Sequence, residues 1–167
     1  MTNSILDNLK YDPQKGRISF QDVPYMLLRP DTVVDFQKAV EARIGDKVAE
    51  MMMAGGYTGG SRSSRRYKEL FNYSDEEIVA FMCKMGGEIG WGRFETEKLD
   101  TESKQLIITV RNSPFAEAYG SSDEGVCHMI RGVLAGMAAG IFGSEVTSEE
   151  ALCRAKGDEL CRFVLNG

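Results

Sequence analysis

The sequence contains one histidine among 167 residues and lacks the short patterns that mark common active sites. No G-x-G-x-x-G segment follows an expected strand, which argues against a bound dinucleotide, and neither G-x-S-x-G nor a phosphate-binding P-loop is present. No spacing of ligands indicates a metal site with an open coordination position. These absences leave little machinery for catalysis, and we expect a binding protein rather than an enzyme.

Positive charge is also scarce, because 20 lysines and arginines against 25 acidic residues give a net charge of −5. Nucleic acids and anionic membranes are bound by basic faces, so we expect neither as a partner. The most apolar segment, within 125–142, falls short of the roughly 18 consecutive apolar residues of a membrane span. The N-terminal MTNSILDNLKYD lacks the basic start and apolar run of a signal peptide. We therefore expect a cytoplasmic protein.

Hydrophobic periodicity predicts an α+β fold, an antiparallel sheet with helices packed on it. The predicted elements follow the order ββ-αα-ββ-α-ββ. Hairpins are favoured over parallel units because the strands occur in pairs joined by short polar turns. The elements are strands 16–20 and 23–28, a helix 30–54, a helix from Ser74 toward Trp91, strands 94–99 and 105–110, a helix 125–142, and a final hairpin with Cys153 and Cys161.

The segment GGYTGGSRSSRRYK, at 55–68, interrupts the helical period. Its four glycines and three serines favour mobility, and its arginines and lysine favour contact with water. We interpret it as a mobile lid over a ligand pocket, and an irregular surface loop is the alternative.

Glycines recur every fourth residue in the last predicted helix, at Gly132, Gly136 and Gly140. Because each glycine costs a helix about 1 kcal/mol relative to alanine, the pattern needs a structural reason. Close packing against the sheet is our first interpretation. A ligand lying beside the helix and a dimer interface are the alternatives.

Cysteines point to a metal site near the end of the chain. Cys153 and Cys161 lie symmetrically about Gly157, so both thiols can face the same side of a hairpin. Cys127 begins the last predicted helix, where the helix dipole favours a thiolate. A tetrahedral site needs a fourth ligand. The candidates are Glu150, His128 and Glu149.

The pattern C-x-A-K-G-D-x-x-C-x-F at 153–163, with Glu150 before it and Cys127 opening a Gly/Ala-rich helix, resembles a known family. Over about 115–163 the chain is similar to the 4-vinyl-reductase-type small-molecule-binding domains. That family includes aromatic-sensing domains of bacterial transcription activators, and its fold resembles that of Golgi transport-particle subunits. The resemblance implies a homodimer and a zinc ion. The implied ligands are Cys127, Glu150, Cys153 and Cys161.

Four protein ligands leave no open position, so the zinc would be structural. It would pin the last hairpin to the preceding helix. A disulfide between Cys153 and Cys161 and a set of unligated core cysteines are the alternatives. Cys83 lies apart from these residues, and we expect it to be a buried small side chain.

We expect the 167 residues to form one small-molecule-binding domain, with about ten loosely ordered N-terminal residues. The predicted function is binding of an apolar hydrocarbon or aromatic ligand without catalysis, with a protein effector receiving the signal. A homodimeric interaction scaffold is one alternative. A reductase, or accessory factor, acting on a tetrapyrrole vinyl group is the other. The candidate pocket residues are Met52, Phe81, Met82, Met85 and Trp91.

Overall fold

The computed structural model describes residues 2–167 and contains two antiparallel sheets and five α-helices over that range. The N-terminal sheet has the order β1-β2-β3, and the main sheet has the order β4-β5-β7-β6. The strands are β1 (Lys10–Asp12), β2 (Arg17–Phe20), β3 (Val23–Tyr25), β4 (Arg93–Asp100), β5 (Gln105–Arg111), β6 (Thr147–Leu152) and β7 (Cys161–Asn166). The helices are α1 (Pro30–Ile44), α2 (Lys47–Phe71), α3 (Asp75–Glu88), α4 (Pro114–Tyr119) and α5 (His128–Phe142), with short 3-10 turns at Leu6–Asn8 and Arg154–Lys156.

The predicted α+β class with antiparallel hairpins is confirmed. The predicted element order missed β1 and α4, which are only 3 and 6 residues long. Elements this short carry too few residues to establish a period, so the sequence pattern did not show them.

The single helix predicted over 30–54 is wrong, because the structure divides it into α1 and the start of α2. Gly45 adopts φ +59°, a left-handed conformation that ends α1, and α2 begins at Lys47. The apolar period continues across this break, so it did not reveal where the helix ends.

The predicted mobile lid at 55–68 is also wrong, since these residues form the second half of the 25-residue helix α2. Gly56 and Gly60 are buried and face α5. An ideal Cβ on Gly60 would stand 2.1 Å from the carbonyl oxygen of Val133. Glycine is therefore required by helix contact, which outweighs its poor intrinsic helix propensity.

The glycines of α5 meet α2 in the same way. Ideal Cβ atoms on Gly132 and Gly136 would stand 2.3 and 2.1 Å from the carbonyl oxygens of Met53 and Tyr57. Gly140 has a looser neighbour, the Ser64 hydroxyl at 3.4 Å. The interpretation that this stripe packs against the sheet is thus corrected: it packs against another helix.

The hydrophobic core lies between the main sheet and the helices. Alternate residues of β5 and β7 point inward and are fully buried, while their neighbours face out. On the outer face Arg162 makes two hydrogen bonds of 2.7 Å to the Glu97 carboxylate. The inward residues are Leu106, Ile108, Val110, Phe163 and Leu165.

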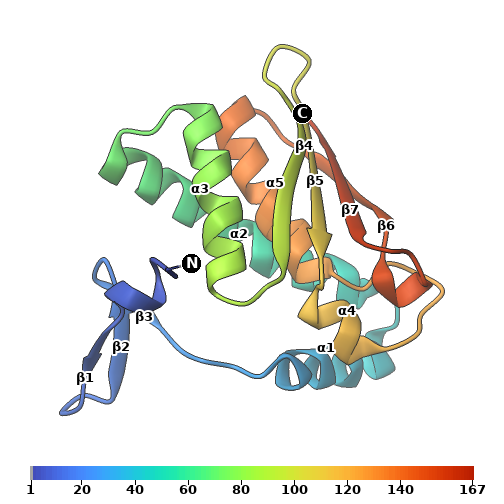
Figure 1. Cartoon of the computed structure of the whole chain (residues 1–167). Helices are drawn as coiled ribbons and strands as arrows, with labels where there is room; N and C mark the ends of the chain where they lie inside the picture. The colour runs from blue at the N-terminus through green and yellow to red at the C-terminus, as the bar shows by residue number, and fades with distance from the viewer. Residues whose placement is uncertain (1) are drawn as a thin grey trace.

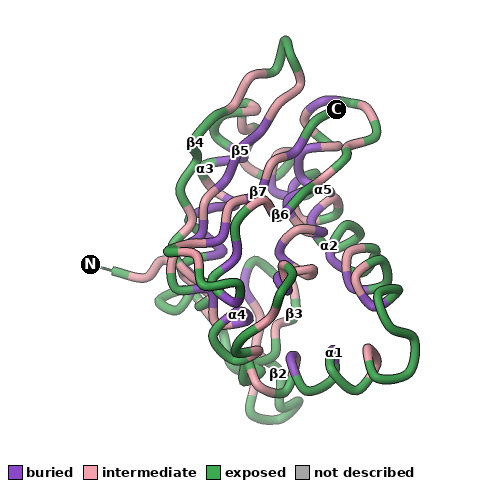
Figure 2. The backbone as a smooth tube through the Cα atoms, turned by 90° about the vertical axis from the view of Figure 1, so that its right-hand side faces the viewer, coloured by how far each residue is buried: buried purple, intermediate pink, exposed green. Residues whose placement is uncertain are grey.

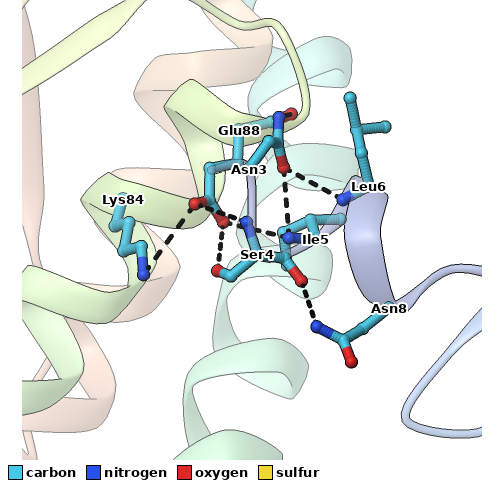
Figure 3. Close-up of polar contacts among 7 residues, drawn as sticks. All are labelled: Asn3, Ser4, Ile5, Leu6, Asn8, Lys84 and Glu88. Carbon is cyan, nitrogen blue, oxygen red and sulfur yellow. Dashed lines mark hydrogen bonds and ion pairs between the residues drawn. The ribbon is translucent and has the colours of Figure 1, made fainter. Parts of the chain in front are cut away.

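The N-terminal sheet lies apart from the main sheet and is followed by an extended segment leading to α1 (Figure 1). Its start is anchored to the end of α3 by Glu88 (Figure 3). The Glu88 carboxylate accepts hydrogen bonds from the Ser4 backbone N–H at 2.9 Å, the Ser4 hydroxyl at 2.7 Å and the Ile5 N–H at 3.2 Å. Asn3 adds a bond to the Glu88 carbonyl oxygen at 2.8 Å.

The start of α3 follows its sequence signal closely. The Ser74 hydroxyl accepts from the Glu77 backbone N–H at 3.2 Å, and the Glu77 carboxylate accepts from the Ser74 N–H at 2.8 Å. This reciprocal capping box fixes the helix start. Among the described residues no helix combines the length and apolarity needed to cross a bilayer.

Candidate metal site and apolar cavity

Four buried side chains converge where the last hairpin meets the start of α5. Their ligand atoms, three thiol sulfurs and one carboxylate oxygen, all lie within 4.8 Å of one another. They are the four residues that the family resemblance implied as a set, Cys127, Glu150, Cys153 and Cys161.

The hairpin register explains why two of the thiols meet. A bulge between Glu150 and Leu152 shifts the β6–β7 pairing, after which Leu152 pairs with Arg162. The next pair in that register would oppose Cys153 to Cys161, so both point to one face. Cys127 reaches the same place as the N-cap residue of α5.

Hydrogen bonds from surrounding groups hold the ligand atoms in position. The Cys127 backbone N–H donates to Glu150 Oε2 at 2.9 Å, and the Arg154 backbone N–H donates to Cys161 Sγ at 3.5 Å. The Ser113 hydroxyl lies 3.3 Å from Cys127 Sγ. Such outer contacts orient metal ligands and reduce their mobility.

The electrostatics of the cluster favour a bound cation. Burial raises the pKa of Glu150 to about 8, and the neighbouring Cys153 adds to this effect. Hydrogen bonds from Cys127 and Cys161 lower the pKa of Cys153, whereas the bond to Cys153 raises the pKa of Cys127. Without a cation the buried group therefore cannot ionise fully, since its negative charges repel one another.

The donor set and its spacing fit a zinc ion. The Cys127 and Cys161 sulfurs lie 3.7 Å apart. A tetrahedral zinc with Zn–S bonds of about 2.3 Å separates two sulfur ligands by about 3.8 Å. Glu150 Oε1 is buried and has no hydrogen-bond partner among the described residues, which leaves it available as a ligand. The cluster can therefore hold a metal such as zinc.

The remaining candidates lie outside the cluster. Neither Glu149, which is exposed on β6, nor His128 belongs to the converging group. Cys83 is buried elsewhere, where its thiol lies 3.8 Å from the Thr96 hydroxyl and burial raises its pKa to about 11. All four cysteines are free thiols in the structure, so Cys153 and Cys161 form no disulfide.

A second feature is an apolar cavity of about 290 Å³ between the N-terminal sheet and the helices. Its wall, as far as the described residues form it, contains no charged side chain. Of the predicted pocket residues, Met82, Met85 and Trp91 line it, whereas Met52 and Phe81 do not. Phe81 instead packs edge-on to Tyr67 at 5.1 Å in a separate aromatic group.

Two parts of this wall carry no recognisable signal in the sequence. One is β3, which brings Val23, Pro24 and Tyr25 from the far end of the chain. The other is the inner face of α5, whose period is that of any core helix. A helical pattern identifies the buried face but not whether it borders a cavity.

Comparison with known proteins identifies relatives. Residues 106–166 match the family model of the 4-vinyl-reductase domain. The phenol regulator MopR of Acinetobacter guillouiae is 27% identical over 171 residues, covering 96% of this chain and 30% of MopR. The chain thus spans less than a third of the length of that regulator.

Two solved structures share the fold. The phenol-responsive sensory domain of the transcription activator PoxR, crystallised with phenol, has a TM-score of 0.85 at 17% identity and covers 98% of this chain and 86% of that one. A trafficking protein particle complex subunit 3 from Naegleria fowleri, covalently bound to palmitic acid, has a TM-score of 0.59 at 11% identity, covering 82% of this chain and 93% of that one.

Proposed function

The chain carries a 4-vinyl-reductase domain over residues 106–166, and we propose that it is a sensor or carrier domain binding one small apolar ligand. The observation that supports this most directly is the uncharged cavity of about 290 Å³. An aromatic or hydrocarbon molecule would enter it without leaving a buried charge unpaired. The bound molecule would contact both the N-terminal sheet and the helices.

Cavity size limits the ligand. A protein cavity of about 150 Å³ lined by apolar side chains binds benzene. The present cavity is about twice that volume, so it suits a bicyclic aromatic or a benzene ring with a short alkyl chain. MopR is a phenol regulator and the PoxR domain was crystallised with phenol, which supports an aromatic ligand here.

A structural zinc ion is the second part of the proposal. Zinc on Cys127, Cys153, Cys161 and Glu150 would join α5 to the final hairpin. Because all four positions are filled by protein, the ion would stabilise shape rather than activate a substrate. Its supporting observation is the convergence of four buried ligand atoms.

A homodimer is the third part, supported by apolar residues that the monomer leaves exposed. The sequence period of 30–54 predicts that Phe36 and Met51 are buried, yet they are 62% and 60% exposed. Met26 and Leu27, in the segment before α1, are 75% and 78% exposed. Figure 2 shows α1 as exposed over most of its length. A second copy covering this surface is also what the interaction-scaffold alternative requires, and a ligand-dependent change there would reach a protein effector.

The ligand proposal is tested by thermal melting with naphthalene. A ligand that binds only the folded state at 100 times its Kd adds about 2.7 kcal/mol of stability, so the Tm should rise. In Met85→Trp the indole would fill the cavity and abolish the rise. Met51→Trp makes the same change at an exposed site and should retain it. An unchanged native Tm across naphthalene and a panel of alkylbenzenes would contradict the proposal.

A further inference from the structure

A tyrosine hydroxyl stands at the wall of the mostly apolar cavity. Tyr25, on β3, lines the cavity, and its hydroxyl lies 3.9 Å from the sulfur of Met85, another lining residue. The same hydroxyl lies 3.1 Å from the hydroxyl of Tyr67 on α2. Tyr67 is only 2% exposed and does not line the cavity.

The burial of Tyr67 determines which hydroxyl donates. Within residues 2–167, the only hydrogen bond recorded for the Tyr67 hydroxyl is the one to Tyr25. A buried donor without an acceptor costs about 1–3 kcal/mol, so the favoured arrangement has Tyr67 donating to Tyr25. The hydrogen of Tyr25 is then directed elsewhere. Its other protein neighbour is the Met85 thioether, which is a weak acceptor.

We propose that Tyr25 determines ligand specificity by donating its hydroxyl hydrogen to a neutral oxygen atom on the ligand, with Tyr67 as the positioning residue. This inference rests on the proposed function, because it assumes that the cavity holds a ligand. Burial, and then the bond to Tyr67, raise the pKa of Tyr25, which keeps the hydroxyl protonated at neutral pH.

The chemistry of the wall narrows the ligand class. A carboxylate would place an unpaired charge among uncharged residues, which is costly. A hydrocarbon would leave the Tyr25 donor with only a sulfur acceptor. A phenol-like hydroxyl or an aryl carbonyl satisfies the donor and fills the apolar remainder of the cavity.

The test compares two probes with matched rings, 2-naphthol and naphthalene, by calorimetric titration. The measured quantity is the Kd of naphthalene divided by the Kd of 2-naphthol. Tyr25→Phe should lower this ratio about three- to tenfold, the value of one neutral hydrogen bond, while the naphthalene affinity is retained. Tyr67→Phe should lower the ratio as well, because the Tyr25 hydroxyl loses its fixed orientation.

The matched control is Tyr11→Phe, which removes an exposed hydroxyl from β1 of the same sheet and should leave the ratio unchanged. If Tyr25→Phe and Tyr67→Phe both bind naphthalene and keep the native ratio, the inference is overturned and the proposed function stands. If neither probe binds the native protein, the proposed function fails and takes this inference with it.

Discussion

Gly60 of α2 and Val133 of α5 approach so closely that a Cβ on the glycine would stand 2.1 Å from the valine carbonyl oxygen. The reverse contact has the same form, since a Cβ on Gly136 would stand 2.1 Å from the carbonyl oxygen of Tyr57. The two helices thus meet backbone to backbone. Neither can be moved away from the other without opening the core beneath them.

Gly60→Ala should therefore destabilise the protein by about 2–3 kcal/mol, because the added methyl group forces α2 and α5 apart. Chemical denaturation measures this loss. Gly55→Ala is the matched control, since nothing lies within 4 Å of a Cβ there. It should stabilise α2 by up to about 1 kcal/mol through helix propensity. Equal effects of the two substitutions would refute this account of the helix contact.

Glu88→Gln should release the N-terminal sheet from α3. The amide carries no charge and cannot accept the Ser4 and Ile5 hydrogen bonds on both oxygens. Hydrogen exchange of residues 3–25 should become several-fold faster. Lys84→Met removes only an exposed ion pair of 3.8 Å and should have little effect. Unchanged exchange in Glu88→Gln would show that other contacts hold the sheet.

The same anchor should depend on pH. Partial burial alone would raise the pKa of Glu88, but hydrogen bonds from Ser4 and Ile5 and the charge of Lys84 lower it below the ordinary value of 4.5. The stabilising contribution is therefore complete above pH 4.5 and is lost as the pH falls through the lowered value. Acid titration followed by NMR of the Ser4 amide should report this loss. Glu88→Gln should abolish that titration.

Cys161→Ser should remove the zinc ion and lower the Tm sharply, because structural zinc contributes on the order of 10 kcal/mol in small zinc-binding peptides. Elemental analysis of protein purified without chelators measures the ion. Cys83→Ser, which changes a buried thiol outside the cluster, should keep the native zinc content. A native protein that contains no zinc under these conditions would rule out the zinc site.

Phe36→Asp should convert the proposed homodimer to a monomer, since it places a charge on the exposed apolar surface of α1. Sedimentation velocity over a range of concentrations measures the change. Leu70→Asp places the same charge at another exposed apolar position, near the end of α2, and should remain dimeric. Native protein that sediments as a monomer at every concentration would exclude the dimer.

Local signals in the sequence predicted much of this structure. The Ser74 capping box, the 94–110 hairpin and the cysteine motif all depend on residues close together along the chain, apart from Cys127. For such features the side chain that needs a partner and the partner itself lie within one pattern. The α+β class follows from the same short-range pairing of strands.

The errors came from contacts between residues far apart in sequence. Glycines at 55–60 suggested a flexible segment, because the sequence does not show that α5 lies against them. Met52 and Phe81 were chosen for the pocket by residue type, whereas the wall also needs Tyr25 from the other end of the chain. A periodic apolar face shows that a side chain avoids water but not which element covers it.

The strand pairs, the helix start at Ser74 and the residues of the buried cysteine cluster can be identified without coordinates, because neighbouring residues or a recognisable motif encode each of them. The helical state of residues 55–68 and the closure of the cavity by β3 become visible only in the folded chain. Both depend on the close approach of distant segments. There, van der Waals contact outweighs the local preference of the backbone.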